Sequence, residues 1–303
     1  MGGPGAAGGL IRLRSEGRGR SYSVLRGLVE SSLRIAYQGN WPRALWQQVP
    51  GACRVAVTRH RLALLPAGSP PLRLGFISDV HLGPTTPEPL LDAAFAHLAE
   101  ARVDLLLLGG DYVFLDATPD KMRSLGRRVA AVPAARKLAV LGNHDLWTLH
   151  DEIERSLESA GVEMIVNRAV VAGGVSVVGL DDPWTGALDA RAAFAGVAPD
   201  RPVVILCHSP DGLPEARAAL ARLPAAPPSL FVCGHTHGGQ VATPWGPIII
   251  PSIVGKQYPS GLFHLPDLSL FVSRGVGGVE VPMRSWASPE VAVFELTARP
   301  AGA

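Results

Sequence analysis

The chain has 303 residues, of which 47% are apolar and 18% charged, a balance that excludes wholesale disorder and suits one large α/β domain or two small ones. Its net charge of +2 is uneven, because residues 1–60 hold nine arginines against only Glu16 and Glu30, while the rest of the chain is acidic. Three cysteines are too few for a disulfide framework, and neither an apolar run of 18 residues nor a secretory signal is present, so we expect a cytoplasmic protein without a spanning helix.

The first 50 residues are predicted to form a basic segment apart from the main domain. Residues 1–20 are rich in glycine and arginine, which predicts disorder. Residues 21–38 follow with apolar side chains at helical spacing, and tryptophans come shortly after them. A basic amphipathic helix beside tryptophans is typical of peripheral contact with an anionic membrane, here through residues 21–46 on the inner face of the plasma membrane; a helix packed on the domain is the alternative. The apolar face comprises Leu25, Leu28, Val29, Leu33 and Ala36.

Residues 51–298 alternate between short apolar runs and helical patterns, and residues 299–303 are predicted to form a disordered tail. This order of elements predicts an α/β (α+β) fold in which two mixed β-sheets pack together with helices outside, a four-layer αββα sandwich. Helices are predicted at 89–101, 121–131 and 151–160, and a further helix between residues 207 and 230. Strands are predicted at 72–78, 104–109, 137–141, around Val166, and at 175–180, 203–207, 230–233, 248–250, 261–264, 269–272 and 291–296.

Five short polar motifs each follow a predicted buried strand. In the first and last, two metal-ligand side chains stand two residues apart, so they project to the same side of an extended backbone. Each motif alone is weak evidence, but polar residues at the carboxyl ends of several buried strands converge on one crevice. The motifs are Ser78-Asp79-Val80-His81-Leu82, Gly109-Gly110-Asp111-Tyr112, Gly142-Asn143-His144-Asp145, Cys207-His208-Ser209-Pro210 and Gly234-His235-Thr236-His237-Gly238-Gly239-Gln240.

The number and kind of these side chains predict two metal ions at the strand ends. Four histidines, two aspartates and one asparagine would be costly to bury unpaired, and divalent cations such as manganese, iron or zinc suit that mixture. Seven ligands are too many for a single ion that keeps an open position, whereas two ions can share one bridging carboxylate. Two ions roughly 3.5–4 Å apart stabilise both the attacking and the leaving oxygen of a phosphate. The net positive charge left there would attract an anionic phosphate.

The ordered set of motifs resembles the calcineurin-like metallophosphoesterase superfamily, over roughly residues 52–296. The flanking Gly238-Gly239-Gln240 and Ser273-Arg274-Gly275 are similar to its bacterial membrane- and envelope-associated branch, some members of which hydrolyse the pyrophosphate of UDP-2,3-diacylglucosamine in lipid A synthesis. The resemblance implies a metal-dependent phosphoesterase that cleaves a phosphodiester or pyrophosphate bond through a hydroxide bridging two metal ions. Its expected substrate is a phosphorylated small molecule or a lipid-linked phosphate, UDP-2,3-diacylglucosamine included.

The resemblance also implies a role for each motif residue. His144 would not be a ligand but would stabilise the charge developing on the phosphate, or protonate the leaving oxygen. Asp145 would orient His144, or alternatively cap a helix. Asp111 would bridge the two metals. The first metal would take Asp79, His81 and His237, and the second would take Asn143, His208 and His235.

Other features keep alternatives open. The family's second motif often ends in an aspartate where this chain has Phe114, a position that is generally not a ligand. Arg274 and Arg284 are candidates for phosphate contact, with surface ion pairing as the alternative, and residues 179–184 form either a pocket wall or a plain turn. A nuclease, a general phosphatase and a catalytically inert binding module are the alternative functions. The basic arm lacks interleaved aromatic residues, which disfavours a nucleic-acid partner, and the intact ligand set argues against an inert module.

Overall fold

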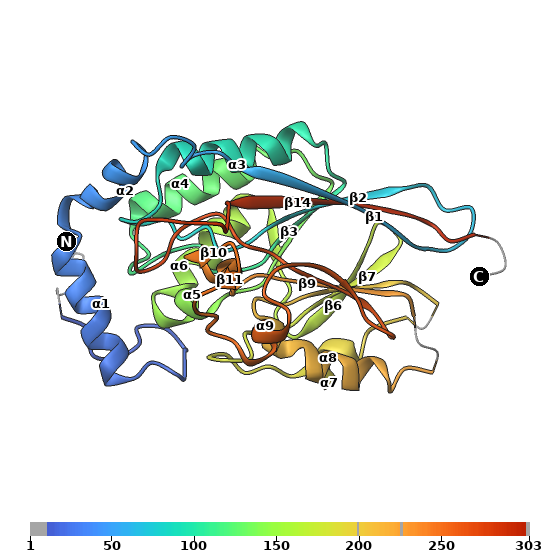
Figure 1. Cartoon of the computed structure of the whole chain (residues 1–303). Coiled ribbons are helices and arrows are strands. Elements are labelled where there is room, and N and C mark those ends of the chain that lie inside the picture. The colour runs from blue at the N-terminus through green and yellow to red at the C-terminus, as the bar shows by residue number, and fades with distance from the viewer. Residues whose placement is uncertain (1–10, 199, 225–226, 301–303) are drawn as a thin grey trace.

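Two six-stranded β-sheets pack face to face with helices on both outer faces, which confirms the predicted four-layer αββα sandwich (Figure 1). The computed structural model describes residues 11–198, 200–224 and 227–300. The first sheet has the order β1 (Ala56–Leu65), β14 (Glu290–Ala298), β2 (Leu72–Ile77), β3 (Leu105–Leu108), β4 (Arg136–Ala139) and β5 (Val162–Met164). The second has the order β12 (Gly261–His264), β13 (Ser269–Val272), β9 (Ser229–Cys233), β8 (Val203–Leu206), β7 (Val175–Gly179) and β6 (Arg168–Ala172).

Both sheets are mixed, and each has a parallel centre. In the first sheet β2 to β5 run parallel, with β14 antiparallel to β2. In the second sheet β13, β9, β8 and β7 run parallel, while β12 and β6 are antiparallel edge strands. The register pairs Ile77 with Leu108, and Leu206 with Val232, so neighbouring strands end level with one another. The loops that follow these strands therefore start at the same edge of each sheet.

The space between the sheets is filled by alternate side chains of the strands. Phe76, Phe271 and Phe294 are buried there, with ring centroids 6.3 Å apart for Phe76–Phe271 and 5.1 Å apart for Phe271–Phe294. Leu106 and Leu108 point the other way, into the core beneath the outer helices. Strands buried on both faces read as unbroken apolar runs, which is why they were recognisable from the sequence.

Helices cover the outer face of each sheet (Figure 1). On the first sheet, Leu90, Leu91, Ala94 and Leu98 of α3 are buried, because their spacing places them on one face of the helix. The helices over the first sheet are α3 (Glu88–Glu100), α4 (Pro119–Ala130) and α6 (His150–Ser159), and those over the second are α7 (Ala190–Phe194) and α8 (Leu213–Leu220).

The amino-terminal segment differs from its prediction. Residues 1–10 of the stretch predicted to be disordered lie outside the described residues, but residues 11–20 pack on the domain through backbone hydrogen bonds to Leu146, Trp147 and Thr185. Docking onto these partners supplies the order that the composition of the segment does not indicate. The segment continues into α1 (Val24–Ala36) and α2 (Trp41–Trp46), which lie at the left edge of Figure 1.

Helix α1 packs with its polar side inward. Glu30 and Ser31 are buried, and Glu30 accepts hydrogen bonds from Arg12, Arg26 and Tyr22. The apolar side points to solvent, where Leu25 is 71% exposed. The helix therefore packs on the domain, which was the alternative interpretation of the sequence. Its apolar face nevertheless stays uncovered, as contact with a membrane would require.

Several shorter elements depart from the sequence pattern. The strand predicted at 248–250 is wrong, because the hairpin lies just before it as β10 (Ala242–Thr243) and β11 (Gly246–Pro247), and Ile248 and Ile249 are exposed. Strand β1 and the short helices α5 (Asn143–Trp147) and α9 (Ile253–Gln257) were not predicted. At the predicted tail, the amide of Arg299 donates to the carbonyl of Leu65, and residues 301–303 lie outside the described residues.

Two further sequence-based expectations concern the thiols and the membrane. Cys207 and Cys233 are free and buried, as predicted, and Cys53 is free and half-buried. Among the described residues, every helix is too short or too polar to cross a bilayer.

Candidate metal centre

The structure brings all seven predicted ligands together at the carboxyl ends of the parallel strands. Asp79 lies two residues beyond β2, His208 two beyond β8 and His235 two beyond β9. All seven side chains are almost fully buried, and the least buried are His235 and His237 at 5% exposure. Strands from both sheets therefore supply one cluster, as the strand-end rule predicts.

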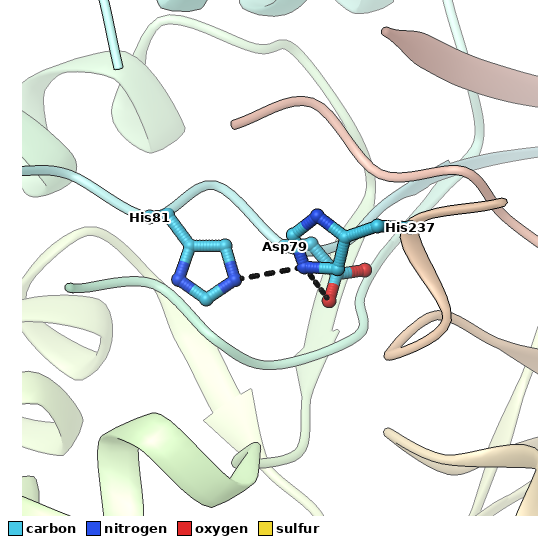
Figure 2. A group of neighbouring side chains, drawn as sticks. All are labelled: Asp79, His81 and His237. Carbon is cyan, nitrogen blue, oxygen red and sulfur yellow. Dashed lines mark hydrogen bonds and ion pairs between the residues drawn. The ribbon is translucent and has the colours of Figure 1, made fainter. Parts of the chain in front are cut away.

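The first group of ligands consists of Asp79, His81 and His237 (Figure 2). The Nε2 atoms of His81 and His237 lie 3.1 Å apart, and the Nε2 of His237 lies 3.3 Å from an oxygen of Asp79. Figure 2 shows the two imidazoles and the carboxylate turned toward one another. Three donor atoms this close could together bind one metal ion.

The second group consists of Asp111, His208 and His235. His208 Nε2 lies 3.2 Å from His235 Nδ1, 3.3 Å from Asp111 Oδ2 and 3.2 Å from the amide oxygen of Asn143. The same Asp111 Oδ2 lies 3.6 Å from His81 Nε2, which belongs to the first group. Asp111 thus stands between the two groups, in the position that a bridging carboxylate needs.

Hydrogen bonds to backbone carbonyls orient two of the imidazoles. The Nδ1 of His208 lies 2.9 Å from the carbonyl oxygen of Gly109, and the Nε2 of His235 lies 3.1 Å from that of Pro251. A protonated nitrogen that donates to a carbonyl leaves the opposite nitrogen of the ring with a free lone pair. In both residues that opposite nitrogen faces the other candidate ligands. Burial would lower the pKa of His208, but Asp111 overcomes it and raises this pKa well above its usual range, so a cation bound here would displace a proton from His208.

The chemistry of these donors fits two divalent cations. Burial lowers the pKa of His81 to about 3 and that of His235 to about 4, so both imidazoles are neutral and carry lone pairs. Burial would raise the pKa of Asp79, but His237 and His208 overcome it and hold this carboxyl below its ordinary value. Facing nitrogens 3.1–3.2 Å apart can share only one proton, whereas a cation can accept both lone pairs. Divalent cations bound here would activate water and neutralise phosphate charge.

The ligand loops have a strained backbone. Asp79, His81, Asp111, His235 and His237 all have positive φ, between 45° and 69°. A residue other than glycine in this region costs on the order of 1–3 kcal/mol, and such residues gather where function requires a particular direction of the side chain. The loops therefore hold their ligands inward at the expense of local stability.

His144 lies beside the ligands without belonging to either group. Its amide donates to Asp111 Oδ1 at 2.8 Å, and its ring centroid is 5.0 Å from that of His81. The ring also packs edge-on against Phe114, which occupies the position where the family often has an aspartate, and against Trp147. Burial lowers the pKa of His144 well below its usual range, with Asp111 opposing, so the ring is neutral near pH 7.

Asp145 ties two motif loops together. Its carboxylate accepts the amides of Asp111 at 2.7 Å, Tyr112 at 2.8 Å and Gly142 at 3.0 Å. The hydrogen bonds of its carboxylate among the described residues go to backbone amides, so the helix-cap interpretation matches the structure. Because it also holds the backbone of Asp111, it links the α5 loop to the proposed bridging ligand.

The two candidate phosphate contacts have other partners. Arg274 pairs with Glu290 at 2.7 Å, which is the ion-pair alternative. Arg284 is half-buried beside the first ligand group, where its Nη2 lies 3.0 Å from His237 Nδ1 and its other nitrogens donate to the carbonyls of Gly277 and Ala287. Arg284 therefore supports the loop of His237 from behind.

Residues 15–22, termed here the strap, form a part of the site that the sequence did not reveal. The amide of Gly19 donates to the carbonyl of Leu146 at 2.8 Å. Arg18 donates two hydrogen bonds to the carboxylate of Asp181, at 2.5 and 2.9 Å. Tyr22 packs edge-on against Trp147. The strap thus closes over the end of α5, the helix that carries Asn143 and His144. Gly17 and Gly19 were the feature of the sequence that could have indicated this contact, because glycine lets the backbone approach a neighbouring segment closely.

Two tryptophans lie beside the site, Trp147 at the end of α5 and Trp184 in contact with it. Trp184, in the stretch named as a candidate pocket wall, has its ring centroid 5.4 Å from that of His235 and 5.9 Å from that of Trp147. Trp184 is half exposed, whereas Trp147 is buried. An aromatic wall therefore runs from the second ligand group to the strap.

Two buried ligand groups at the strand ends of an αββα sandwich define the metallophosphoesterase class, a class of hydrolases acting on phosphoric esters. Residues 72–239 match the calcineurin-like phosphoesterase family, and the chain belongs to that family. Phosphodiesterase YaeI of Escherichia coli is 31% identical over 245 residues, which cover 78% of this chain and 87% of YaeI.

Two other relatives extend the comparison. The metallophosphoesterase YkuE of Bacillus subtilis is 28% identical, with 80% of this chain and 85% of YkuE covered. UDP-2,3-diacylglucosamine pyrophosphatase LpxG of Chlamydia trachomatis is 25% identical, with 76% of this chain and 84% of LpxG covered. The similarity in each case extends over most of both chains.

Proposed function

We propose that this enzyme hydrolyses a phosphodiester or pyrophosphate bond at a site that holds two divalent cations, manganese, iron or zinc. The observation that carries the proposal is the position of the Asp111 carboxylate between two buried ligand groups, 3.3 Å from His208 and 3.6 Å from His81. In this proposal Asp79, His81 and His237 hold the first cation, Asn143, His208 and His235 hold the second, and Asp111 bridges them. The similarity to the phosphodiesterase YaeI and to the pyrophosphatase LpxG supports the choice of diester or pyrophosphate over monoester.

His144 is proposed to act on the substrate. Among the motif residues around the ligands, its side chain is the one that is only half-buried, and it adjoins both His81 and Asp111. A neutral imidazole there can donate one hydrogen bond to a phosphate oxygen as negative charge develops on it. The packing of Phe114 and Trp147 against the ring fixes the direction of that donor.

A lipid-linked phosphate such as UDP-2,3-diacylglucosamine is the proposed substrate class. It is supported by the similarity to LpxG and by the uncovered apolar face of α1. We propose that this face, within residues 21–46, contacts the membrane peripherally on its cytoplasmic side. An apolar helical face flanked by arginines suits the boundary between headgroups and acyl chains. The cytoplasmic location itself stays a prediction from the cysteine content.

The metal proposal is tested by replacing the bridging carboxylate. For Asp111→Asn we expect the metal content of the purified protein to fall below two ions per chain and turnover of bis(p-nitrophenyl) phosphate to drop more than about 100-fold. The matched control is Asp267→Asn, at a surface carboxylate that pairs only with Arg217 among the described residues. Unchanged metal content and turnover in the Asp111 variant would rule out the proposed centre.

The substrate and membrane proposals need separate assays. A UDP-linked lipid, single-stranded DNA and a phosphate monoester, offered side by side, should show preference for the lipid; preference for DNA would indicate the nuclease alternative. For membrane contact, Leu25→Asp should reduce sedimentation with anionic vesicles. Deleting the whole segment is a poorer test, because the strap packs against α5. Equal sedimentation of the Leu25 variant and the unchanged chain would refute contact through α1.

A further inference from the structure

A second group of apolar side chains is exposed beside the metal centre, far from α1 in the sequence. We call it the apolar belt, and it consists of Trp245, Ile248, Ile249, Ile253, Met283 and Trp286. Trp245 is 93% exposed, Ile253 84% and Trp286 72%. Single exposed apolar residues are ordinary, but large ones gathered in neighbouring segments indicate a surface that is covered in use.

Hydrogen bonds join the segments of the belt into one structure. The amide of Ala242 in the hairpin donates to the carbonyl of Ser285 at 2.9 Å, and the amide of Ser285 donates to the carbonyl of Gln240 at 3.0 Å. The side-chain amide of Gln240 donates to the carbonyls of Val279 and Val281. The hairpin that carries Trp245 and the loop that carries Trp286 are therefore held side by side.

The belt adjoins the metal ligands. Pro251, between Ile249 and Ile253, accepts the hydrogen bond from His235 at 3.1 Å. Gln240, which anchors the belt, is only three residues beyond His237. A surface that contacts the belt would therefore lie next to the mouth of the site.

The loop that carries Met283 and Trp286 also connects the belt to α1. Glu280 pairs with Arg26 of α1, and its carbonyl accepts the hydroxyl of Tyr37 at 2.6 Å. Figure 1 shows α1 at the left edge of the molecule and the β10–β11 hairpin inward of it. Glu280 thus joins the two apolar surfaces.

The composition of the belt favours a lipid leaflet as its partner. Residues 240–266 contain no carboxylate and one cation, Lys256, and residues 11–50 hold seven arginines against two glutamates. The first stretch therefore has no carboxylate to be repelled by an anionic surface, and the second is basic enough to be attracted to one. The belt side chains also stand on separate tips: Trp245 in the hairpin turn, Ile253 at the first turn of α9 and Trp286 in a loop. Tryptophan and isoleucine on separate tips can enter acyl chains, whereas a second copy of the chain would need a matching shape.

We infer that the apolar belt is a second membrane-inserting surface, which together with α1 holds the mouth of the metal centre against the lipid headgroups. The inference rests on the proposed action on a lipid-linked phosphate. In this arrangement the phosphate meets the site at headgroup level, and the acyl chains stay in the leaflet. Two separate anchors also fix the orientation of the enzyme, which α1 alone would leave free to rotate about its axis.

The test uses the full chain and vesicles of phosphatidylcholine and phosphatidylglycerol. The double variant Trp245→Ser with Ile253→Asp should lower the vesicle partition coefficient about tenfold or more, because it removes two large apolar side chains from the leaflet. Its turnover of bis(p-nitrophenyl) phosphate should not change, since both side chains point to solvent. The control Val171→Asp alters an apolar residue that is also exposed, on edge strand β6, and should leave the partition coefficient unchanged.

The outcomes separate this inference from the proposed function. If the double variant loses partitioning into vesicles but keeps its turnover of the soluble substrate, the result supports membrane insertion of the belt. If the double variant and the unchanged chain partition equally, the inference is overturned. It is also overturned if ultracentrifugation without lipid shows that the unchanged chain is a dimer and the double variant is a monomer, because the belt would then be a dimer interface. Failure of the proposed function is a different result, in which the unchanged chain hydrolyses neither the soluble diester nor the lipid-linked phosphate. Quenching of tryptophan fluorescence by nitroxide-labelled lipids gives an independent readout, and this quenching should weaken in Trp245→Phe.

Discussion

The substitution Gly19→Ala tests whether the strap is part of the catalytic domain. A Cβ at this position would lie 2.7 Å from the carbonyl oxygen of Leu146 and 2.8 Å from Cδ1 of Trp147. Such contacts are closer than van der Waals packing allows, and the obstructing oxygen belongs to the backbone. Overpacking of this kind costs about 1–3 kcal/mol. The backbone dihedral of Gly19 is not left-handed, so the crowding alone is responsible.

The energy with which the strap is docked limits that cost, because a strap that no longer fits can lift away. Three backbone hydrogen bonds hold it, donated by Glu16, Gly19 and Arg20, together with the ion pair of Arg18 and Asp181. At about 1 kcal/mol for each hydrogen bond, docking is worth a few kcal/mol in all. We therefore expect the local stability of the strap to fall by about 1–3 kcal/mol, with little effect on the rest of the fold.

Hydrogen exchange measures this change directly. Protection of the Glu16 and Arg20 amides should fall by about 5- to 150-fold in Gly19→Ala, the factor that corresponds to 1–3 kcal/mol. Turnover should fall as well, with metal content unchanged, because the strap holds the end of the helix that carries His144. The control is Gly196→Ala, where an added Cβ meets nothing within 4 Å. Unchanged amide protection in the Gly19 variant would show that the strap does not pack as described.

Three further substitutions probe other parts of the molecule. Asp145→Asn should weaken metal binding about 10- to 100-fold in calorimetric titration, because an amide cannot accept every backbone hydrogen bond that the carboxylate accepts; equal affinity would contradict its role. Glu30→Gln removes the buried one of Arg12's two charge partners and leaves only Glu16, so exchange of the α1 amides should accelerate, and unchanged exchange would exclude this pair as the anchor of α1. Burial lowers the pKa of Lys121 from 10.5 to about 8. The unfolded chain therefore keeps this proton to a higher pH than the folded chain does, and the free energy of unfolding should rise by up to a few kcal/mol between pH 8 and 10.5. Urea titrations of Lys121→Met should lack this part of the rise, and identical pH profiles would refute it.

The sequence by itself determined the layers and the side chains that gather at the strand ends. Strands such as β3 are buried on both faces and so appear as unbroken apolar runs, which a local pattern reveals. Because parallel strands end at one edge, the order of the polar motifs was enough to predict that Asp79, Asp111 and His208 meet. Spacing of two residues did not by itself decide which ligands pair, because Asp79 and His81 share the first group whereas His235 and His237 belong to different groups.

Only the tertiary structure decided how the ligands are held. Five of them have positive φ, a conformation that no local pattern predicts, because the surrounding fold supplies the energy to maintain it. The position of Arg284 behind His237 is likewise a contact between residues 47 positions apart. Its charge alone had suggested a surface ion pair, with a phosphate contact as the other candidate role.

The amino-terminal segment shows the same division most clearly. The spacing of Leu25, Leu28 and Val29 established that they share one face of a helix, and it could not establish whether that face is buried. That outcome depends on which face finds partners, and the polar face finds them in Arg12, Tyr22 and the domain surface. Periodicity determines which side chains lie together, whereas the choice of the side that meets the protein is a property of the whole fold.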